Sequence, residues 1–120
     1  MRDHHSSRTV VEIETELLQL AEALGGEEAR QILDMFLEDS LSRLERLSRA
    51  VQTADDATAR QEAHSLKGAA GSVGATSLWN ICAGVESDVR AVDWYRAASD
   101  VAELRQCLCE VQGHFDGQAA

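Results

Sequence analysis

Residues 27–53, EEARQILDMFLEDSLSRLERLSRAVQT, carry a regular apolar pattern. Apolar side chains recur there at steps of three and four residues, at Ile32, Leu33, Phe36, Leu37, Leu41, Leu44, Leu47 and Val51. That spacing puts them on one face of an α-helix, and the acidic pair Glu27-Glu28 suits the positive end of a helix dipole. The stretch therefore predicts one long amphipathic helix.

The sequence on either side predicts four more helices, over residues 10–24, 56–72, from 76 onward, and 94–112. Proline is absent from the chain, so nothing forces a kink in them. Long helices joined by short loops are typical of helix bundles. We expect an all-α fold, an antiparallel four-helix bundle with a short additional N-terminal helix.

Residue types that favour helix ends support these boundaries. Asp55 or Asp56, Thr76 and Asp93 are the N-cap candidates, because their side chains can accept a hydrogen bond from a free backbone N–H. Gly25-Gly26 is expected to end the first helix and Gly113 the last. The expected domain spans residues 10–115, with a flexible tail at 1–9 and a C-terminal tail at 116–120.

Composition narrows the classes of partner. Twenty-one acidic and 11 basic residues give a net charge of −10, which repels a phosphate backbone, and aromatic residues are only 4% of the chain. We therefore expect no nucleic-acid partner and favour a protein partner.

The uncharged run 68–85 holds four glycines and is too polar to span a membrane. No apolar leader begins the chain and its three cysteines are an odd number, so we expect a cytoplasmic protein with reduced thiols.

The most informative stretch is residues 63–75, AHSLKGAAGSVGA. At about 100° per residue, Arg60, Lys67, Gly68 and Gly71 fall within about 60° of His64, on one face of the helix. The apolar stripe lies on the opposite side and consists of Ala59, Ala63, Leu66, Ala70 and Val73. His64 is therefore expected to face solvent.

Two features of this face are unusual for a purely structural helix. Gly68 and Gly71 each cost about 1 kcal/mol relative to alanine inside a helix, which suggests that another molecule approaches this backbone closely. The alternative is that the glycines begin the end of the helix, which suits Gly71 and Gly74 better than Gly68. Lys67, the only lysine of the chain, stands one turn after His64, where its ammonium can pair with an anion on the ring.

His64-Ser65-Leu66-Lys67-Gly68 resembles the His-x-x-Lys-Gly signature of histidine-containing phosphotransfer (Hpt) domains. The resemblance extends over most of residues 13–112. It implies a phosphorylatable histidine at His64, a lysine at Lys67 that stabilises the phosphoryl charge, and a Gly68 that leaves room for a receiver domain. It also implies a phosphocarrier without ATP-dependent kinase activity, and the sequence shows no nucleotide-binding motif.

The partners that the resemblance implies are response-regulator receiver domains and a hybrid sensor histidine kinase in a multistep phosphorelay. We expect a monomer with no cofactor or metal of its own, and Mg²⁺ on the receiver. Arg60 and Gly71 are expected to contact the partner. An exposed apolar patch is expected on the second helix, with Phe36 as the first choice and Met35 or Leu37 beside it.

Two alternatives stay open at this stage. In these alternatives the chain is either a helical adaptor that binds a receiver or kinase without being phosphorylated, or a phosphotransfer module cut from a larger chemotaxis-type or hybrid kinase. Other candidate sites are weaker. The thiols of Cys107 and Cys109 lie about 200° apart on a helix and cannot share a metal ion. Arg43, Arg46 and Arg49 are expected to form a solvated basic stripe.

Overall fold

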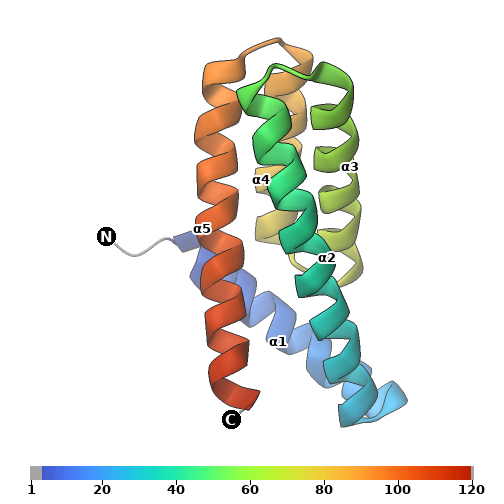
Figure 1. Cartoon of the computed structure of the whole chain (residues 1–120). Coiled ribbons are helices and arrows are strands. Elements are labelled where there is room, and N and C mark those ends of the chain that lie inside the picture. Colours follow the sequence, from blue (N-terminus) through green and yellow to red (C-terminus); the bar gives the residue numbers. More distant parts are fainter. Residues whose placement is uncertain (1–3, 120) are drawn as a thin grey trace.

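A computed structural model describes residues 4–119, and over this range the chain forms helices and no strand. The helices are α1 (His4–Leu24), α2 (Gly26–Gln52), α3 (Asp56–Ser72), α4 (Thr76–Arg90) and α5 (Trp94–Ala119). Helices α2 to α5 run alternately up and down as a bundle, and α1 crosses its lower half against α2, α4 and α5 (Figure 1). The predicted all-α bundle with an additional N-terminal helix is confirmed.

Both terminal helices are longer than the sequence pattern indicated. Helix α1 begins at His4 instead of residue 10, and buried Thr9 accepts a hydrogen bond from Cys107 Sγ of α5 at 3.5 Å. Helix α5 continues through Gly113 to Ala119, because Phe115 is 1% exposed and anchors that last stretch in the core. The predicted tails are therefore wrong for residues 4–9 and 116–119; residues 1–3 and 120 lie outside the described chain.

The core contains the apolar faces predicted from helical spacing. The stripe of α3 is buried throughout, at Ala59, Ala63, Leu66 and Ala70, with Val73 just beyond the helix. The inward residues of α5 are also buried, at Ala97, Val101, Leu104, Leu108 and Val111. Because the buried side chains of α3 are mostly alanines, the helix can lie close to its neighbours. The opposite face of α3 remains in solvent.

Two of the predicted N-caps are confirmed and one is wrong. Asp55 accepts a hydrogen bond from the Thr58 N–H at 3.2 Å, and Asp93 accepts one from the Arg96 N–H at 3.0 Å. Thr76 does not cap α4. Instead Glu12 of α1 accepts hydrogen bonds from the N–H and the hydroxyl of Ser77, at 2.9 and 3.1 Å. A carboxylate from another helix thus satisfies the first turn of α4 and joins α1 to it.

Three consecutive helices end in the same way. Ala54, Gly74 and Val92 follow α2, α3 and α4 with φ angles of 54°, 69° and 56°. In each case the N–H of the next residue donates to the carbonyl five positions earlier, at 2.8, 2.9 and 2.8 Å. This pairing satisfies carbonyl groups that the helix end leaves open. The left-handed conformation is unfavourable for alanine and valine by about 1–2 kcal/mol, so the surrounding packing holds these two turns in place.

An acidic contact joins α4 to α5. The side chains of Asp88 and Asp100 share a hydrogen bond, and burial, this bond and the charges of Asp100 and Asp93 raise the pKa of Asp88 to about 6. An aspartate in the unfolded chain has a pKa of about 3.9. The folded state therefore holds this proton more tightly, and the stability linked to it falls as pH rises from about 4 through about 6.

We expect Asp88→Asn to remove this pH dependence, because an amide needs no proton to share a hydrogen bond with Asp100. The gain in melting temperature over the unmodified protein should be larger at pH 7.5 than at pH 5. Thermal unfolding of both proteins at the two pH values measures it. An equal gain at both values would show that Asp88 titrates normally.

Candidate functional site

His64 lies in the middle of α3, on the face that points away from the core. Its side chain is 72% exposed, whereas the neighbouring Ala63 and Leu66 are buried. The sequence-based prediction that His64 faces solvent is confirmed. Since the histidine occupies a regular helix, its position depends on the rigid backbone and not on a loop.

Glu86 of α4 is the main partner of His64. Its Oε2 lies 3.5 Å from His64 Nδ1, and its Oε1 lies 2.8 Å from Lys67 Nζ. Arg90, one turn further along α4, approaches Oε2 at 3.7 Å. The Glu86 side chain is only 12% exposed, so one largely buried carboxylate lies next to the positive groups of Lys67 and Arg90 and to the His64 ring.

The pKa of Glu86 is lowered from its ordinary value. Burial alone opposes ionisation, but the hydrogen bond and charge of Lys67, followed by the contact with His64, outweigh it. Lys67 is also held from the other side, with Nζ 5.3 Å from the centre of the Trp79 ring. The ammonium is therefore fixed between a carboxylate and an aromatic face, one turn from the histidine.

Space is open beside the histidine at Gly68. A Cβ built on Gly68 would meet no atom within 4 Å, whereas one built on Gly71 would lie 3.6 Å from Trp79 Cδ1. Gly68 is exposed and lies inside α3, while Gly71 and Gly74 flank the end of the helix. The helix-end interpretation therefore suits Gly71 and Gly74, and it leaves Gly68 without a local structural reason.

Arg60 lies one turn before His64 on the same helix face. Its Nη2 pairs with Asp56 Oδ2 at 2.7 Å, and its side chain is 55% exposed. An exposed ion pair of this kind adds little to stability. The guanidinium is thus placed at the surface where a partner covering His64 would meet it.

Of the three residues named for an exposed apolar patch on α2, Met35 is exposed and Phe36 and Leu37 are buried. Phe36 and Leu37 are 7% and 5% exposed and belong to the core, while Met35 is 70% exposed. Met35 precedes Asp39 by one turn, and Asp39 binds Arg43, which reaches α3. Met35 therefore lies about 40° from Asp39 around α2, on the exposed surface next to the Asp39–Arg43 pair. The first choice of Phe36 was wrong because its apolar neighbours alone do not tell which side chain turns inward.

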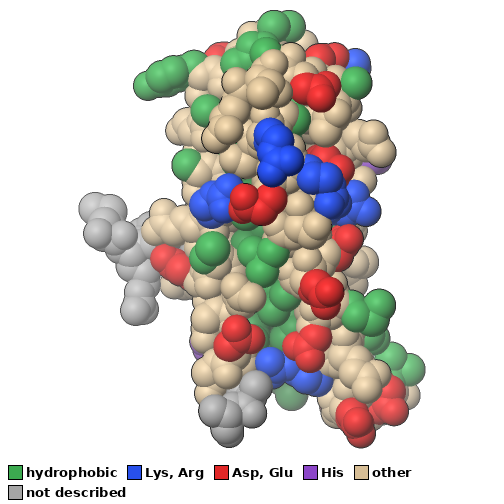
Figure 2. Space-filling model, viewed as in Figure 1, with side chains coloured by type: hydrophobic (Ala, Val, Ile, Leu, Met, Phe, Trp, Pro, Cys, Tyr) green, Lys and Arg blue, Asp and Glu red, His purple; other side chains and the backbone are tan. Residues whose placement is uncertain are grey.

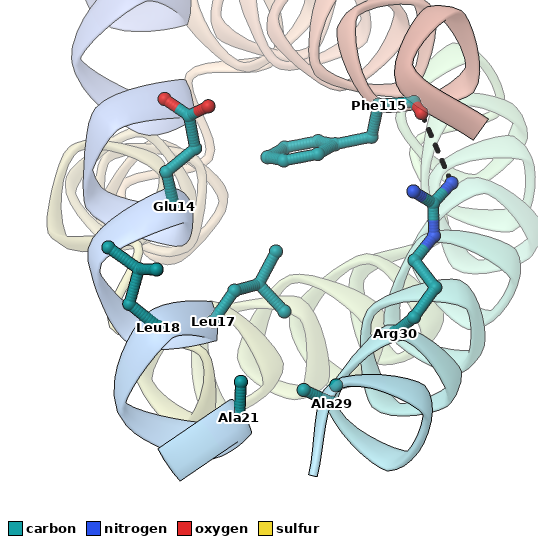
Figure 3. Close-up of a pocket in the computed structure, with 8 residues that line it drawn as sticks. Glu14, Leu17, Leu18, Ala21, Ala29, Arg30 and Phe115 are labelled. Atoms are coloured by element: carbon teal, nitrogen blue, oxygen red, sulfur yellow. Dashed lines mark hydrogen bonds between the residues drawn. The ribbon is translucent and has the colours of Figure 1, made fainter. Parts of the chain in front are cut away.

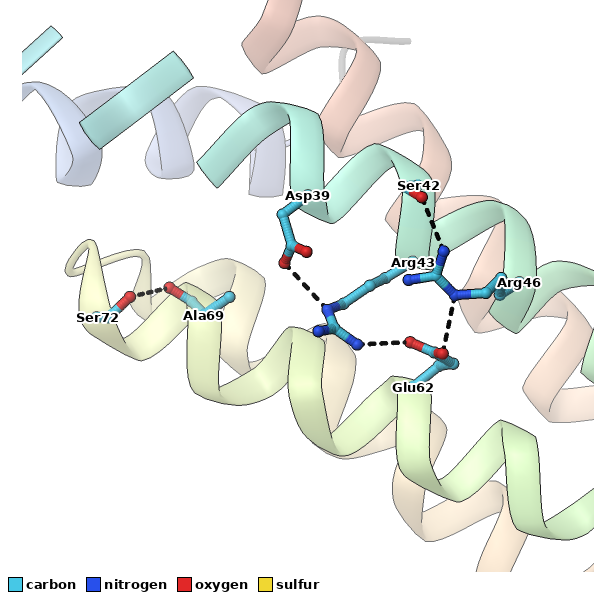
Figure 4. A network of polar contacts seen from close by, with 7 residues as sticks. All are labelled: Asp39, Ser42, Arg43, Arg46, Glu62, Ala69 and Ser72. Carbon is cyan, nitrogen blue, oxygen red and sulfur yellow. Dashed lines mark hydrogen bonds and ion pairs between the residues drawn. The ribbon is translucent and has the colours of Figure 1, made fainter. Parts of the chain in front are cut away.

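A buried carboxylate ties α3 to α2 just before the histidine. Glu62 is 7% exposed and accepts hydrogen bonds from Arg43 Nη1 at 2.9 Å and from Arg46 Nε at 3.0 Å (Figure 4). The predicted solvated stripe is therefore wrong for Arg43, whose side chain is 29% exposed. The Arg46 side chain is 47% exposed, as predicted, and its guanidinium also helps to neutralise the buried charge. Glu62 precedes His64 by only two residues. Its hydrogen bonds to Arg43 and Arg46 therefore fix where His64 lies along the length of α2.

Comparison with known proteins agrees with this geometry. The family model described as the Hpt domain matches residues 31–114. The chain belongs to the Hpt domain family. A solved structure, the histidine-containing phosphotransfer protein B (HptB) from Pseudomonas aeruginosa PAO1, is 30% identical, with a TM-score of 0.78 over 87% of this chain and 90% of that one. Among curated proteins, none matches the chain significantly. The protein is thus a histidine phosphotransfer protein of the kind that acts in phosphorelays.

Other candidate sites carry no comparable arrangement. Within residues 4–119, no group of three or more His, Cys, Asp or Glu side chains is placed to hold a metal ion. Cys107 is buried and Cys109 exposed, as their spacing predicted, and Cys82 is buried. Burial, with the nearby Cys107 and Glu86, raises the pKa of Cys82 to about 12, which makes it an unreactive core thiol. None of the described helices is long and apolar enough to cross a membrane.

Two members of this Hpt site were not identified as site residues from the sequence. They are Glu86 and Trp79, and neither stands out within the helix predicted from residue 76 onward. Both lie on α4, and only the packing of α3 against α4 brings them to Lys67. One sequence does not show which residues of two helices face each other. The signal that could have been used is charge: a lone lysine on an exposed face favours an acidic residue on the neighbouring helix.

We expect Glu86→Gln to slow phosphotransfer roughly tenfold, because hydrogen bonds to charged groups contribute about 1.5–3 kcal/mol and about 1.4 kcal/mol is a factor of ten. In Glu86, Oε1 faces Lys67 and Oε2 faces His64; glutamine replaces one of these two oxygens with an NH2 group that only donates, so one of the two contacts is lost together with the negative charge. Glu45→Gln is the matched control, since Glu45 pairs with Arg105 of α5. Rates of transfer from a phosphorylated receiver measure the effect; equal rates in both variants would deny Glu86 a role.

Proposed function

We propose that this protein carries a phosphoryl group on His64 between the aspartates of receiver domains in a multistep two-component relay. The observation that supports this most strongly is the arrangement of His64 and Lys67 on α3, with the largely buried Glu86 of α4 against them and open space at Gly68. It offers a nucleophile, a cation for the transferred group and room for a second protein, all on rigid helices.

The contact with Glu86 favours Nε2 as the ring nitrogen that reacts. When Nδ1 carries the proton and faces the Glu86 carboxylate, the lone pair is left on Nε2 of the exposed ring. Nε2 attacks the phosphorus of a receiver aspartyl phosphate, the P–N bond forms, and the P–O bond to the aspartate breaks, which releases its carboxylate. The ring becomes positively charged, and Glu86 stabilises that charge while Nδ1 keeps its proton. The return step reverses these bonds.

Lys67 and the receiver share the charge of the transferred group. The transition state spreads negative charge over three phosphoryl oxygens, so positioning and nearby cations contribute most of the catalysis. Lys67 Nζ is held by Glu86 within one turn of the histidine and can exchange that contact for a phosphoryl oxygen. The second cation is Mg²⁺ on the receiver. The Hpt protein itself needs no cofactor and has no ATP-dependent kinase activity.

The proposed partners are a receiver domain of a response regulator and a hybrid sensor histidine kinase. The docking surface combines Arg60, Gly68 and Gly71 of α3 with the exposed Met35 of α2. We propose that the protein acts as a cytoplasmic monomer, because a net charge of −10 opposes self-association.

The test is incubation with a receiver domain that carries phosphate on its aspartate. We expect an acid-labile, alkali-stable phosphate to appear on the protein, and peptide mapping to place it at His64. ATP with Mg²⁺ alone should leave the protein unlabelled. If a receiver binds but no label is transferred with any receiver of the organism, the adaptor hypothesis replaces this proposal.

A further inference from the structure

A second surface lies away from the phosphotransfer site. A groove of about 510 Å³ opens between α1, α2 and α5 (Figure 3). Its walls are mostly apolar and are formed by Leu17, Leu18, Ala21, Ala29 and Phe115. In the close-up the Phe115 ring extends from α5 towards α1 at the level of Glu14, and Leu17 lies below it. The groove is thus a preformed apolar hollow and not a gap filled by its own side chains.

The apolar surface continues beyond the groove along α1. Leu18 is 69% exposed, and Val11 is 61% exposed. These two residues are seven positions apart, so they lie on one line along the helix surface. Figure 2 shows hydrophobic side chains in the furrow between α5 and the lower part of α2. Exposed leucine and valine beside an apolar hollow are typical of a surface that another molecule covers.

The charges around the groove are mainly acidic. Glu14 of α1 stands on one rim and Arg30 of α2 on the other (Figure 3). Arg30 is already engaged, because its Nε binds Asp34 Oδ1 at 3.0 Å and its Nη2 binds the Phe115 carbonyl at 3.1 Å. Glu14 lies 3.3 Å from His114 Nε2. Each of four further exposed acidic residues adjoins a lining residue in the sequence and adds negative charge to this end of the bundle: Glu22, Glu27, Glu28 and Asp116. The rim therefore favours a cationic partner.

The groove is separate from the His64 surface. All its lining residues belong to α1, α2 and α5, whereas His64, Lys67, Glu86 and Trp79 lie on α3 and α4. On α2 the groove uses Ala29 and Arg30, and Met35 lies about 140° further round the helix from Arg30. A receiver on His64 and a second partner in the groove can therefore bind at the same time.

We propose that this groove docks an amphipathic helix of a partner protein, with apolar residues on one face and Lys or Arg on the flanks. Grooves between helices accept a helix through anchors at positions i, i+4 and i+7, and the line from Val11 to Leu18 offers matching contacts. The acidic rim selects basic flanks. A second copy of this chain fits less well, since each copy carries a charge of −10.

A designed peptide tests this chemistry directly. The probe is a 16-residue peptide of leucine and lysine at helical spacing, and the control is a scrambled peptide of the same composition. We expect the amphipathic peptide to bind at least tenfold more tightly by fluorescence anisotropy at 0.15 M salt. In NMR spectra it should shift the signals of Ala21, Ala29 and Phe115, and leave those of His64 unchanged.

Two matched variants locate the binding. Leu18→Glu puts a charge on the apolar wall and should weaken binding at least tenfold, even though it makes the protein more acidic. Leu24→Glu makes the same change at a 52% exposed leucine outside the lining and should not weaken it. Both sites are exposed, so both variants should fold and accept phosphate as before.

Three results would overturn the proposal. The first is equal binding of the amphipathic and scrambled peptides, which would indicate attraction by net charge alone. The second is unchanged binding to the Leu18→Glu variant. The third is a dimer of the free protein in analytical ultracentrifugation that Leu18→Glu dissociates, which would assign the groove to a second copy.

Discussion

His64→Gln is expected to abolish acceptance of phosphate from a phosphorylated receiver. Glutamine keeps a polar side chain of similar reach but has no ring nitrogen to form the P–N bond. The His64 side chain is 72% exposed and forms no part of the core, so the bundle should fold normally. Radiolabel transfer from the receiver measures the loss, and thermal unfolding checks that stability changes by less than about 0.5 kcal/mol.

His114→Gln is the matched control for this substitution. His114 is also exposed and also lies near a glutamate, with Nε2 at 3.3 Å from Glu14 Oε2, but it is on α5. We expect this variant to accept phosphate at the normal rate. Full labelling of the His64→Gln protein, with the phosphate at His4, His5 or His114, would overturn the assignment of His64.

The features predicted correctly from the sequence are those that depend on neighbours within one helix. The exposed face of α3 is an example, because the buried stripe from Ala59 to Ala70 repeats at helical spacing and leaves His64 on the other side. The caps at Asp55 and Asp93 depend on a residue three positions away. Such patterns need no knowledge of how the helices pack.

The features that were missed depend on contacts between helices. Glu12 caps α4 from 65 residues away, and Glu62 binds two arginines of α2 that looked solvated. The extension of α5 past Gly113 likewise rests on the burial of Phe115. In each case a side chain contacts a residue of another helix, and a single sequence does not show which helices lie next to each other. Tertiary packing therefore overrides the local preference.

Gly68 offers a position where stability and function are expected to change in opposite directions. The residue is helical and exposed, and an added Cβ would meet nothing within 4 Å. Gly68→Ala should therefore stabilise the fold by roughly 0.5–1 kcal/mol, because alanine loses less backbone entropy in a helix. Chemical denaturation measures this gain. A position selected for stability alone would carry alanine.

The larger effect is expected for receiver-dependent transfer. Gly68→Gln keeps the helix but fills the open space beside His64, and a displacement of about 1 Å between reacting groups can cost roughly a hundredfold in rate. Transfer from a phosphorylated receiver should fall by about that factor, while phosphorylation by a small phosphodonor such as phosphoramidate should change little. That difference separates a blocked approach of the partner from damage to the histidine.

Gly113 supplies the matched control, since it is also helical and exposed and also has nothing within 4 Å of an added Cβ, but it lies on α5. Gly113→Gln should stabilise the fold about as much as Gly68→Gln and leave receiver transfer unchanged. Equal transfer rates in the two variants would remove the close-approach role of Gly68. A hundredfold loss confined to Gly68→Gln would mean that the missing side chain is needed because the receiver must reach His64 across this turn of α3.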